Sequence, residues 1–248
     1  MKKLIIPILL SLIFLTPSFA QTVDEILTEY FSVIGQEKLL ATNTFTTKGK
    51  IVQQQFEIPF ITYNKRPMNF RLEAEFQGMK IISGFDGKTG WSINPMMGSS
   101  DPQPMTEEQI DRMKIQSDYD GMFYDYADKG YKIEFTGKDK FDDIDVYLLK
   151  LTRPNGDIIT TYMDAENYVI LKSTAKMQVQ GVDTETEMIF SNYKTVDGIL
   201  IPFSMETKMN GQTVMQMVSD EIIYNVDISD SMFEMPQVSA PADSTGSK

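Results

Sequence analysis

The segment FDGKTGWSINP, residues 85–95, decides the fold class of this 248-residue chain. It joins two apolar runs through Asp86-Gly87 and contains the only tryptophan, Trp91. A related pattern, SNYKTVDGILIP, recurs at residues 191–202. Asp-Gly between apolar runs is a strong hairpin signal, because glycine accepts the positive φ that a tight turn requires. The two copies predict a large antiparallel sheet rather than an alternating α/β core.

The segments on both sides of this hairpin alternate apolar and polar residues with a period of two. Upstream, residues 70–76 alternate phenylalanine, leucine and alanine with arginine and glutamate. Downstream, residues 169–179 show the cleanest alternation in the chain, and Asn155-Gly156 and Asn210-Gly211 mark further turns. This period is typical of half-buried strands. We count eleven or twelve strands joined by tight turns.

Two capping boxes predict helices. Residues 22–25 and 106–109 each begin with threonine and carry glutamate or glutamine three positions later, which is the start signal of a helix. Residues 96–104 are interpreted as a loop, and the acidic-aromatic segment 119–124 as a second helical piece. Because residues 96–130 interrupt the strands, they are the expected mobile element or lid.

The first twenty residues have the pattern of a secretory signal peptide. Lys2 and Lys3 precede an apolar core at 4–15 and a small-x-small cleavage signal at 18–20. The apolar core is short for a bilayer span of ~20 residues, so a retained membrane anchor is the less favoured alternative. We therefore expect cleavage after residue 20 and a soluble protein in the periplasm.

The charge of the exported chain argues against nucleic acid as a partner. Cleavage would remove two of the 23 basic residues and none of the 35 acidic residues, so the net charge would change from −12 to −14. Such an acidic surface repels phosphate backbones. Residues 21–236 contain no evident linker and are predicted to form one domain. Residues 237–248 are predicted to form a disordered tail, because they contain almost no large apolar residues.

Composition removes most catalytic chemistry from consideration. The chain has no cysteine and no histidine, so it lacks a thiol nucleophile, a Ser-His-Asp triad and the usual zinc or copper ligands. Asp142, Asp143 and Asp145 form one group of carboxylates, and Asp118 and Asp120 form another. Such groups can bind calcium or act as an acid-base pair. We interpret both as solvated turns and expect no catalytic residues, no metal and no cofactor.

Methionine is unusually frequent, with 17 residues in the chain and 16 outside the signal peptide. Because the thioether side chain is flexible and polarisable, a methionine-rich surface can fit apolar ligands of varied shape. The alternative interpretation is ordinary core filling. A sheet of eleven or twelve strands in one domain must curl into a barrel or half-barrel. Its concave face must then be filled by its own side chains, by a helix or by something bound.

Several segments together resemble the Lol-type (LolA/LolB-like) periplasmic lipoprotein carriers. They resemble more closely the Bacteroidetes-style outer membrane lipoprotein-sorting proteins. After the signal peptide, the segments are TVDEILTEYFSVIGQEKL (22–39), Lys65-Arg66-Pro67, and residues 84–95, 129–152 and 193–202. The resemblance extends over nearly all of residues 22–236.

The resemblance implies a mainly β (α+β) fold, an open, curved antiparallel half-barrel whose concave face is covered by two or three helices. The N-terminal helix and residues 106–126 would form the lid over a hydrophobic cavity. Arg66 is the candidate for the arginine that latches this lid. The inward-facing apolar residues expected to line the cavity are Phe31, Phe70, Leu72, Phe76, Met79, Ile81, Trp91, Met113, Met122, Phe123, Leu171, Met177, Met188, Phe203, Met205 and Met215.

The function implied by the resemblance is a non-enzymatic carrier that holds lipoprotein acyl chains, or another lipid, for transfer towards the outer membrane. The expected partners are a lipid or acylated lipoprotein and lipoprotein-handling proteins of the inner and outer membranes, with the carrier itself a monomer. The alternative is an envelope sensor or protein-interaction module on the same scaffold. A hydrolase would need a pair of buried, converging acids.

Overall fold

The computed structural model describes residues 21–179 and 182–237. The predicted signal peptide and residues 238–248 of the predicted tail lie outside the described residues. Within the described part no helix is both long and apolar enough to cross a membrane.

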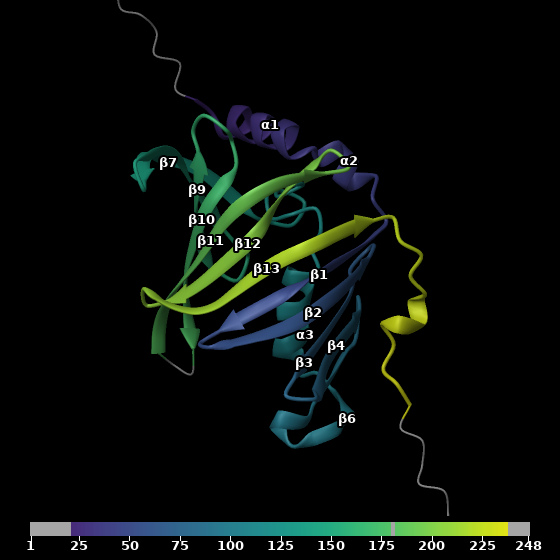
Figure 1. Cartoon of the computed structure of the whole chain (residues 1–248). Helices are drawn as coiled ribbons and strands as arrows, with labels where there is room; N and C mark the ends of the chain where they lie inside the picture. Colours follow the sequence, from purple (N-terminus) through teal and green to yellow (C-terminus); the bar gives the residue numbers. More distant parts are fainter. Residues whose placement is uncertain (1–20, 180–181, 238–248) are drawn as a thin grey trace, which may run out of the picture.

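Thirteen strands of the described chain form one open antiparallel sheet (Figure 1). Their order is β6-β5-β4-β3-β2-β1-β13-β12-β11-β10-β9-β8-β7, so only the central pair, β1 and β13, joins distant parts of the sequence. The bounds are β1 (Thr44–Gln53), β2 (Phe56–Lys65), β3 (Asn69–Phe76), β4 (Met79–Asp86), β5 (Gly90–Asn94), β6 (Ser99–Pro104), β7 (Lys132–Phe141), β8 (Ile144–Thr152), β9 (Ile158–Asp164), β10 (Ile170–Val179), β11 (Val182–Val196), β12 (Ile199–Met209) and β13 (Gln212–Tyr224). The predicted open, curved, mainly β sheet is confirmed.

The thirteenth strand corrects the loop predicted at residues 96–104. A short 3₁₀ turn, η1 (Pro95–Met97), is followed by β6, which pairs with β5 at the edge of the sheet. Proline is tolerated in an edge strand because one side of the strand has no ladder hydrogen bonds to lose. The two prolines of β6 therefore argued against a strand in the sequence, although an edge strand tolerates them.

Within residues 21–179 and 182–237, three α-helices accompany the sheet, namely α1 (Val23–Ile34), α2 (Gln36–Leu40) and α3 (Glu107–Gln116). Both predicted capping boxes are present, at Thr22 of α1 and Thr106 of α3. The helical piece predicted at 119–124 is wrong, because residues 117–131 form successive turns instead. We call residues 117–131 the insert loop.

The helices and the insert loop lie on the concave face, and Figure 1 shows the sheet curving around α3. Three buried clusters join them to the strands. α1 and the insert loop pack on β8 and β9, α2 packs on β12 and β13, and α3 packs on β3 and β4. The buried members are Ile26, Leu27, Phe123, Tyr147, Leu149, Leu151, Ile159 and Met163 in the first cluster, Ile199, Phe203, Ile222 and Tyr224 in the second, and Phe70, Phe85 and Met113 in the third.

The C-terminal residues 225–237 lie on the opposite, convex face. Lys65 Nζ donates to Ile228 O at 2.8 Å, and Arg71 Nη1 donates to Met232 O at 2.8 Å. Trp91 Nε1 donates to Phe233 O at 2.8 Å. These bonds, from strands β2, β3 and β5, fix the C-terminal segment across one half of the sheet.

The Asp86-Gly87 turn of the opening segment closes the hairpin of β4 and β5. The Asp86 carboxylate accepts hydrogen bonds from Lys88 N at 2.8 Å, Thr89 N at 2.6 Å and Thr89 Oγ1 at 2.8 Å. Partial burial opposes ionisation of Asp86, but these hydrogen bonds outweigh it and hold its pKa below the ordinary value of 3.8. The charged form of Asp86 is therefore the form that stabilises the turn.

Replacing Asp86 should weaken the pH dependence of stability. Because the folded-state pKa of Asp86 is lowered, its contribution is present above pH 4 and is lost as the pH falls through the folded-state pKa. Asp86→Asn should cost about 1 kcal/mol at pH 7 and show a smaller further loss at pH 3 than the natural chain. Urea unfolding at both pH values measures this, with exposed Asp227→Asn as the control for one lost charge. An equal loss on acidification in Asp86→Asn and the natural chain would disprove the role of the turn.

The second Asp-Gly pattern positions the helices. Gly198 lies in the turn between β11 and β12, and Gly35 separates α1 from α2 with φ +72°. A Cβ at Gly35 would lie 2.3 Å from Gly198 O. The absence of a side chain at this position thus lets the helix junction lie directly on the hairpin.

Alanine at Gly35 should destabilise the protein more than alanine at Gly211. Both glycines have positive φ, at +72° and +77°, but nothing lies within 4 Å of a Cβ at Gly211. The backbone strain alone is worth roughly 1–2 kcal/mol, and the contact with Gly198 should add about 1–3 kcal/mol for Gly35→Ala. Urea unfolding of the two variants measures the difference, and equal losses would contradict the close packing.

Candidate functional site

An apolar row of side chains crosses five adjacent strands, from β11 through β12, β13 and β1 to β2. Directly paired residues of an antiparallel sheet point to the same face. The row, called the apolar row below, follows the consecutive pairs Phe190–Met205, Met205–Met217, Met217–Ile51 and Ile51–Ile58.

The apolar row lies on the concave face. Phe203 precedes Met205 by two residues on β12, so both side chains point the same way. Phe203 is buried in the cluster that includes Leu39 of α2. The row therefore shares its face with the helices but lies further along the strands, beyond the cover that α2 provides.

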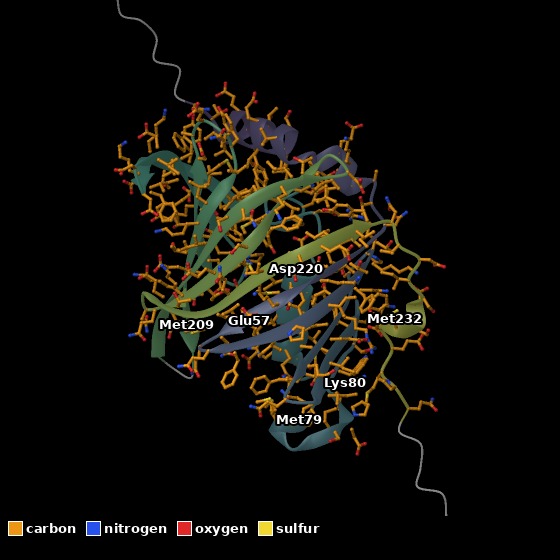
Figure 2. All side chains as sticks on the ribbon, in the orientation of Figure 1. Glu57, Met79, Lys80, Met209, Asp220 and Met232 are labelled. Carbon is orange, nitrogen blue, oxygen red and sulfur yellow. The ribbon has the colours of Figure 1, made fainter. Side chains whose placement is uncertain are left out.

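The same face continues onto β3 and β4. Phe70 packs against Met113 of α3, and Phe76 lies an even number of residues further along β3. Phe76 pairs with Met79 of β4, which is labelled in Figure 2, and meets the ring of Phe56 edge-on, with 5.1 Å between ring centroids. Phe56 is 47% exposed, so the apolar surface reaches the end of the strands.

All five side chains of the apolar row are partly exposed. None of them belongs to the three buried clusters or to the partly buried residues that pack against those clusters. A contiguous apolar surface that a protein leaves uncovered is typical of a binding site. The row is thus the part of the concave face that is free to contact another molecule.

The concave face over β7–β10 is filled by the protein itself. Ile26 of α1 and Phe123 of the insert loop pack with Leu149 and Met163 of the strands. The rings of Tyr30 and Phe123 meet edge-on, with centroids 5.7 Å apart. This half of the sheet is therefore closed, in contrast to the half that carries the apolar row.

Arg66 connects the end of β2, the end of α2 and the insert loop. Its Nε donates to Thr42 O at 2.6 Å and its Nη2 to Leu39 O at 3.0 Å. Its Nη1 and Nη2 also donate to the two carboxylate oxygens of Asp120, at 3.1 and 2.7 Å. The side chains of the pair are only 23% and 26% exposed. We call this set of contacts the Arg66 latch.

The Arg66 latch combines two roles that usually need separate residues. Carbonyls at the C-terminal end of a helix lack intrahelical partners, and the Arg66 guanidinium donates to two carbonyls at that end of α2. The same planar group binds Asp120 in a bidentate arrangement, which is the stronger geometry for an ion pair. The position of the insert loop is thereby tied to the end of α2.

Further polar contacts fix the insert loop. Lys129 Nζ donates to Asp118 Oδ2 at 2.7 Å and to Gly121 O at 2.8 Å, which closes the loop on itself. Gln36, which is buried in α2, donates its Nε2 to Asp120 O at 3.1 Å. The loop is therefore a compact unit held to the helices by hydrogen bonds as well as by the apolar packing of Phe123.

The buried tyrosines are neutral hydrogen-bonding groups. Burial raises the pKa of Tyr30 to about 12, and it also raises the pKa of Tyr119 and Tyr193. The Tyr193 hydroxyl donates to Ile170 O at 2.6 Å. No group of three or more acidic side chains in the described residues is arranged to hold a metal ion. What the concave face offers is chiefly apolar contact.

A surface recess of about 520 Å³ lies on the outer side of α1. Asp24, Glu25 and Glu29 line it together with Gln21 and Tyr168. None of these residues belongs to the apolar row, and the acidic lining does not suit an acyl chain.

The structure divides the residues predicted to line a cavity into two main groups. Those that lie on the partly exposed half of the concave face, in or beside the apolar row, are Phe76, Met79, Ile81, Met188, Met205 and Met215. Those that pack in or against the three buried clusters are Phe31, Phe70, Leu72, Met113, Met122, Phe123 and Phe203.

Three predicted lining residues belong to neither group. Trp91 points to the convex face, where its ring is buried and its Nε1 donates to Phe233 O. Leu171 lies at a register shift of β10, and its neighbour Ile170 contacts the first cluster instead. The side chain of Met177 lies outside the described residues.

Sequence reasoning missed most of the apolar row. Ile51, Ile58, Phe190 and Met217 were not among the predicted lining residues. Only the pairing of β1 with β13 brings them together. The latch partner Asp120 was also missed, because a carboxylate in a turn has no local signal for a distant arginine.

No family model and no curated protein sequence matches the chain. The solved structures that share its fold include the following three. A DUF1329 family protein from Desulfovibrio piger is 15% identical, with 84% of this chain and 97% of that chain covered and a TM-score of 0.59. A LolA superfamily protein from Nitrosomonas europaea is 16% identical, with 87% and 98% covered and a TM-score of 0.57. A domain named for outer membrane lipoprotein sorting, from Vibrio parahaemolyticus, is 12% identical, with 82% and 95% covered and a TM-score of 0.54.

Removal of the Arg66 latch should destabilise the insert loop. Arg66→Ala removes the Arg66 donors from the Asp120 carboxylate and Thr42 O, and one of the donors to Leu39 O, at an expected loss of about 2–3 kcal/mol. Amide hydrogen exchange should accelerate in residues 117–131 more than in the sheet. Arg112→Ala, which breaks an exposed pair with Glu108, should cost less than ~0.5 kcal/mol. Unchanged exchange of the insert loop in Arg66→Ala would contradict the latch.

Proposed function

We propose that this protein is a periplasmic binding or carrier protein that holds an acyl chain of a lipoprotein, or another lipid, on its concave face. The observation that carries the proposal is the apolar row, a partly exposed apolar surface on the same face as the helices. The fold supports it, because two of the solved structures that share it are named for the LolA superfamily and for lipoprotein sorting. A signal peptide at residues 1–20 would deliver the chain to the periplasm.

The dimensions of the apolar row suit one acyl chain. Adjacent strands lie about 4.8 Å apart, so a row across five strands extends over roughly 19 Å. The hydrocarbon core of a bilayer is about 30 Å thick, so an acyl chain of one leaflet occupies about 15 Å of it. A single chain can therefore lie across β11, β12, β13, β1 and β2 in contact with the whole row.

Partial exposure of the apolar row is compatible with release of the ligand. Full burial of a sixteen-carbon chain is worth roughly 13 kcal/mol, at about 0.8 kcal/mol per CH₂. A chain that lies on an open surface gains a fraction of this value, so its binding stays reversible. Movement of the insert loop over the chain would increase the gain, and such movement would require breaking the Arg66 latch.

The proposed activity is binding without covalent chemistry. The site residues are methionine, phenylalanine and isoleucine, and the buried Tyr30 and Tyr193 are neutral because burial raises their pKa. None of these side chains is a general base, or an activated hydroxyl, thiol or amine nucleophile for acyl or phosphoryl transfer, at neutral pH. The partner is thus recognised by its apolar chain.

A protein-interaction function without lipid is the second candidate. Its supporting observation is the first buried cluster, in which α1 and the insert loop fill the concave face over β7–β10. Native mass spectrometry of the protein purified from the periplasm separates the two candidates. A co-purifying lipid or acylated peptide supports the carrier. A ligand-free mass that is unchanged after a lipopeptide is added supports the interaction module.

A charge in the centre of the apolar row should abolish acyl-chain binding. Met217→Glu places a carboxylate where the chain would lie, so the Kd for a fluorescent sixteen-carbon fatty acid should rise more than about tenfold. Ile223→Glu is the matched control, because Ile223 lies on the same strand, is 40% exposed and points to the other face. Circular dichroism verifies that both variants fold. Equal affinity of the two variants would place the ligand elsewhere.

A further inference from the structure

We infer that four methionines of the concave face form an oxidation site that switches off ligand binding. The four residues are Met188, Met205, Met215 and Met217, called the methionine cluster below. The inference rests on the proposed function, because it concerns the regulation of the same apolar surface. It concerns the reaction of the thioether sulfur atoms with oxidants, which plays no part in the proposed binding of an acyl chain.

The register places the four methionines next to one another. Met205 of β12 pairs directly with Met217 of β13, in the centre of the apolar row. In the adjacent row, Thr207 of β12 pairs with Met188 on one side and with Met215 on the other. Side chains in directly opposite or diagonal positions of a sheet are within reach of one another. The four thioethers therefore form one continuous patch on three neighbouring strands.

Partial exposure makes the methionine cluster accessible to small oxidants. All four side chains are partly exposed, whereas Met163 is 0% exposed and Met113 is 8% exposed. The chain contains no cysteine, so no thiol competes for the oxidant. Susceptibility to oxidation follows exposure. The cluster should accordingly react before the methionines of the buried clusters.

The oxidant is a peroxide such as hydrogen peroxide. The thioether sulfur attacks one peroxide oxygen, a sulfur–oxygen bond forms and the oxygen–oxygen bond breaks. The sulfur loses two electrons and becomes a sulfoxide, and the peroxide is reduced to water after proton transfer to the leaving oxygen. The product is a polar, chiral side chain in place of a flexible apolar one.

Oxidation should weaken binding while the fold remains intact. A sulfoxide under an acyl chain is a buried polar group without a hydrogen-bond partner, and such burial is unfavourable. The methionine cluster lies outside the three buried clusters, so its oxidation leaves their packing unchanged. The modification is reversible, because methionine sulfoxide reductases restore the thioether.

The test compares binding and oxidation in the same samples. The full exported chain is treated with hydrogen peroxide, and its sulfoxides are located by peptide mass spectrometry. Binding of a fluorescent sixteen-carbon fatty acid is measured before treatment, after it and after incubation with a reductase. We expect sulfoxides in the methionine cluster, a Kd that rises at least about tenfold, and recovery of the affinity after reduction.

Two leucine variants test whether oxidation of the methionine cluster causes the loss of affinity. In the first, Met188, Met205, Met215 and Met217 are all replaced by leucine, and each sample is compared with its own untreated form. In the second, Met96→Leu and Met97→Leu remove two side chains of η1 that are 56% and 84% exposed. The first variant should lose the effect of peroxide on affinity. The second should bind and respond as the natural chain does.

The outcomes separate this inference from the proposed function. If the untreated chain binds no fatty acid, the proposed function fails and the regulation fails with it. If the untreated chain binds, the inference alone is overturned by either of two results. One is full affinity with the methionine cluster oxidised, and the other is a cluster that stays reduced while Met113 or Met163 is oxidised.

Discussion

The concave face of a thirteen-strand sheet is larger than its short helices can cover. Twelve intervals of about 4.8 Å make the sheet roughly 58 Å broad along its curve. The twelve-residue α1 is about 18 Å long, the ten-residue α3 about 15 Å, and each helix is about 10 Å wide. Large parts of the face must then be covered by loops or left open. The insert loop covers one part, and the apolar row is what remains.

The division between closed and open halves depends on how the cover is fastened. Besides the apolar packing of Phe123 and its neighbour Met122, the insert loop is held by polar contacts to Arg66 and Gln36. The contact between Arg66 and Asp120 is bidentate and has limited access to water, which makes it the strongest of these polar contacts. Arg66 also donates to carbonyls at the end of α2, so movement of the loop would alter the hydrogen bonds at the end of that helix.

The sequence predicted well the parts of the fold that depend on local patterns. The Asp-Gly turns, the capping boxes at Thr22 and Thr106 and the alternating strands all reflect interactions within a few residues. The edge strand β6 was missed because its prolines oppose strand formation locally, and only its position at an edge permits them. The helical piece at 119–124 was wrong because tertiary contacts of its aromatic residues determine the chain path there.

The candidate site was less predictable, because it depends on pairing between distant strands. Ile51 and Met217 meet only through the contact of β1 with β13, and no local signal specifies that contact. Strand phase was correct for residues 70–76, but Trp91 was assigned to the wrong face. A single tryptophan in a hairpin is equally compatible with either face, and its hydrogen bond to Phe233 O decided between them.

The position of Trp91 has an optical consequence. It is the only tryptophan of the chain, it is 1% exposed, and the Arg71 guanidinium carbon lies 5.3 Å from its ring centroid. Intrinsic indole emission of this protein therefore reports the environment beneath the C-terminal segment. A ligand on the concave face would lie on the opposite side of the sheet from Trp91 and would leave that emission unchanged. Detachment of residues 225–237, in contrast, would expose the ring to water and shift its spectrum to longer wavelength.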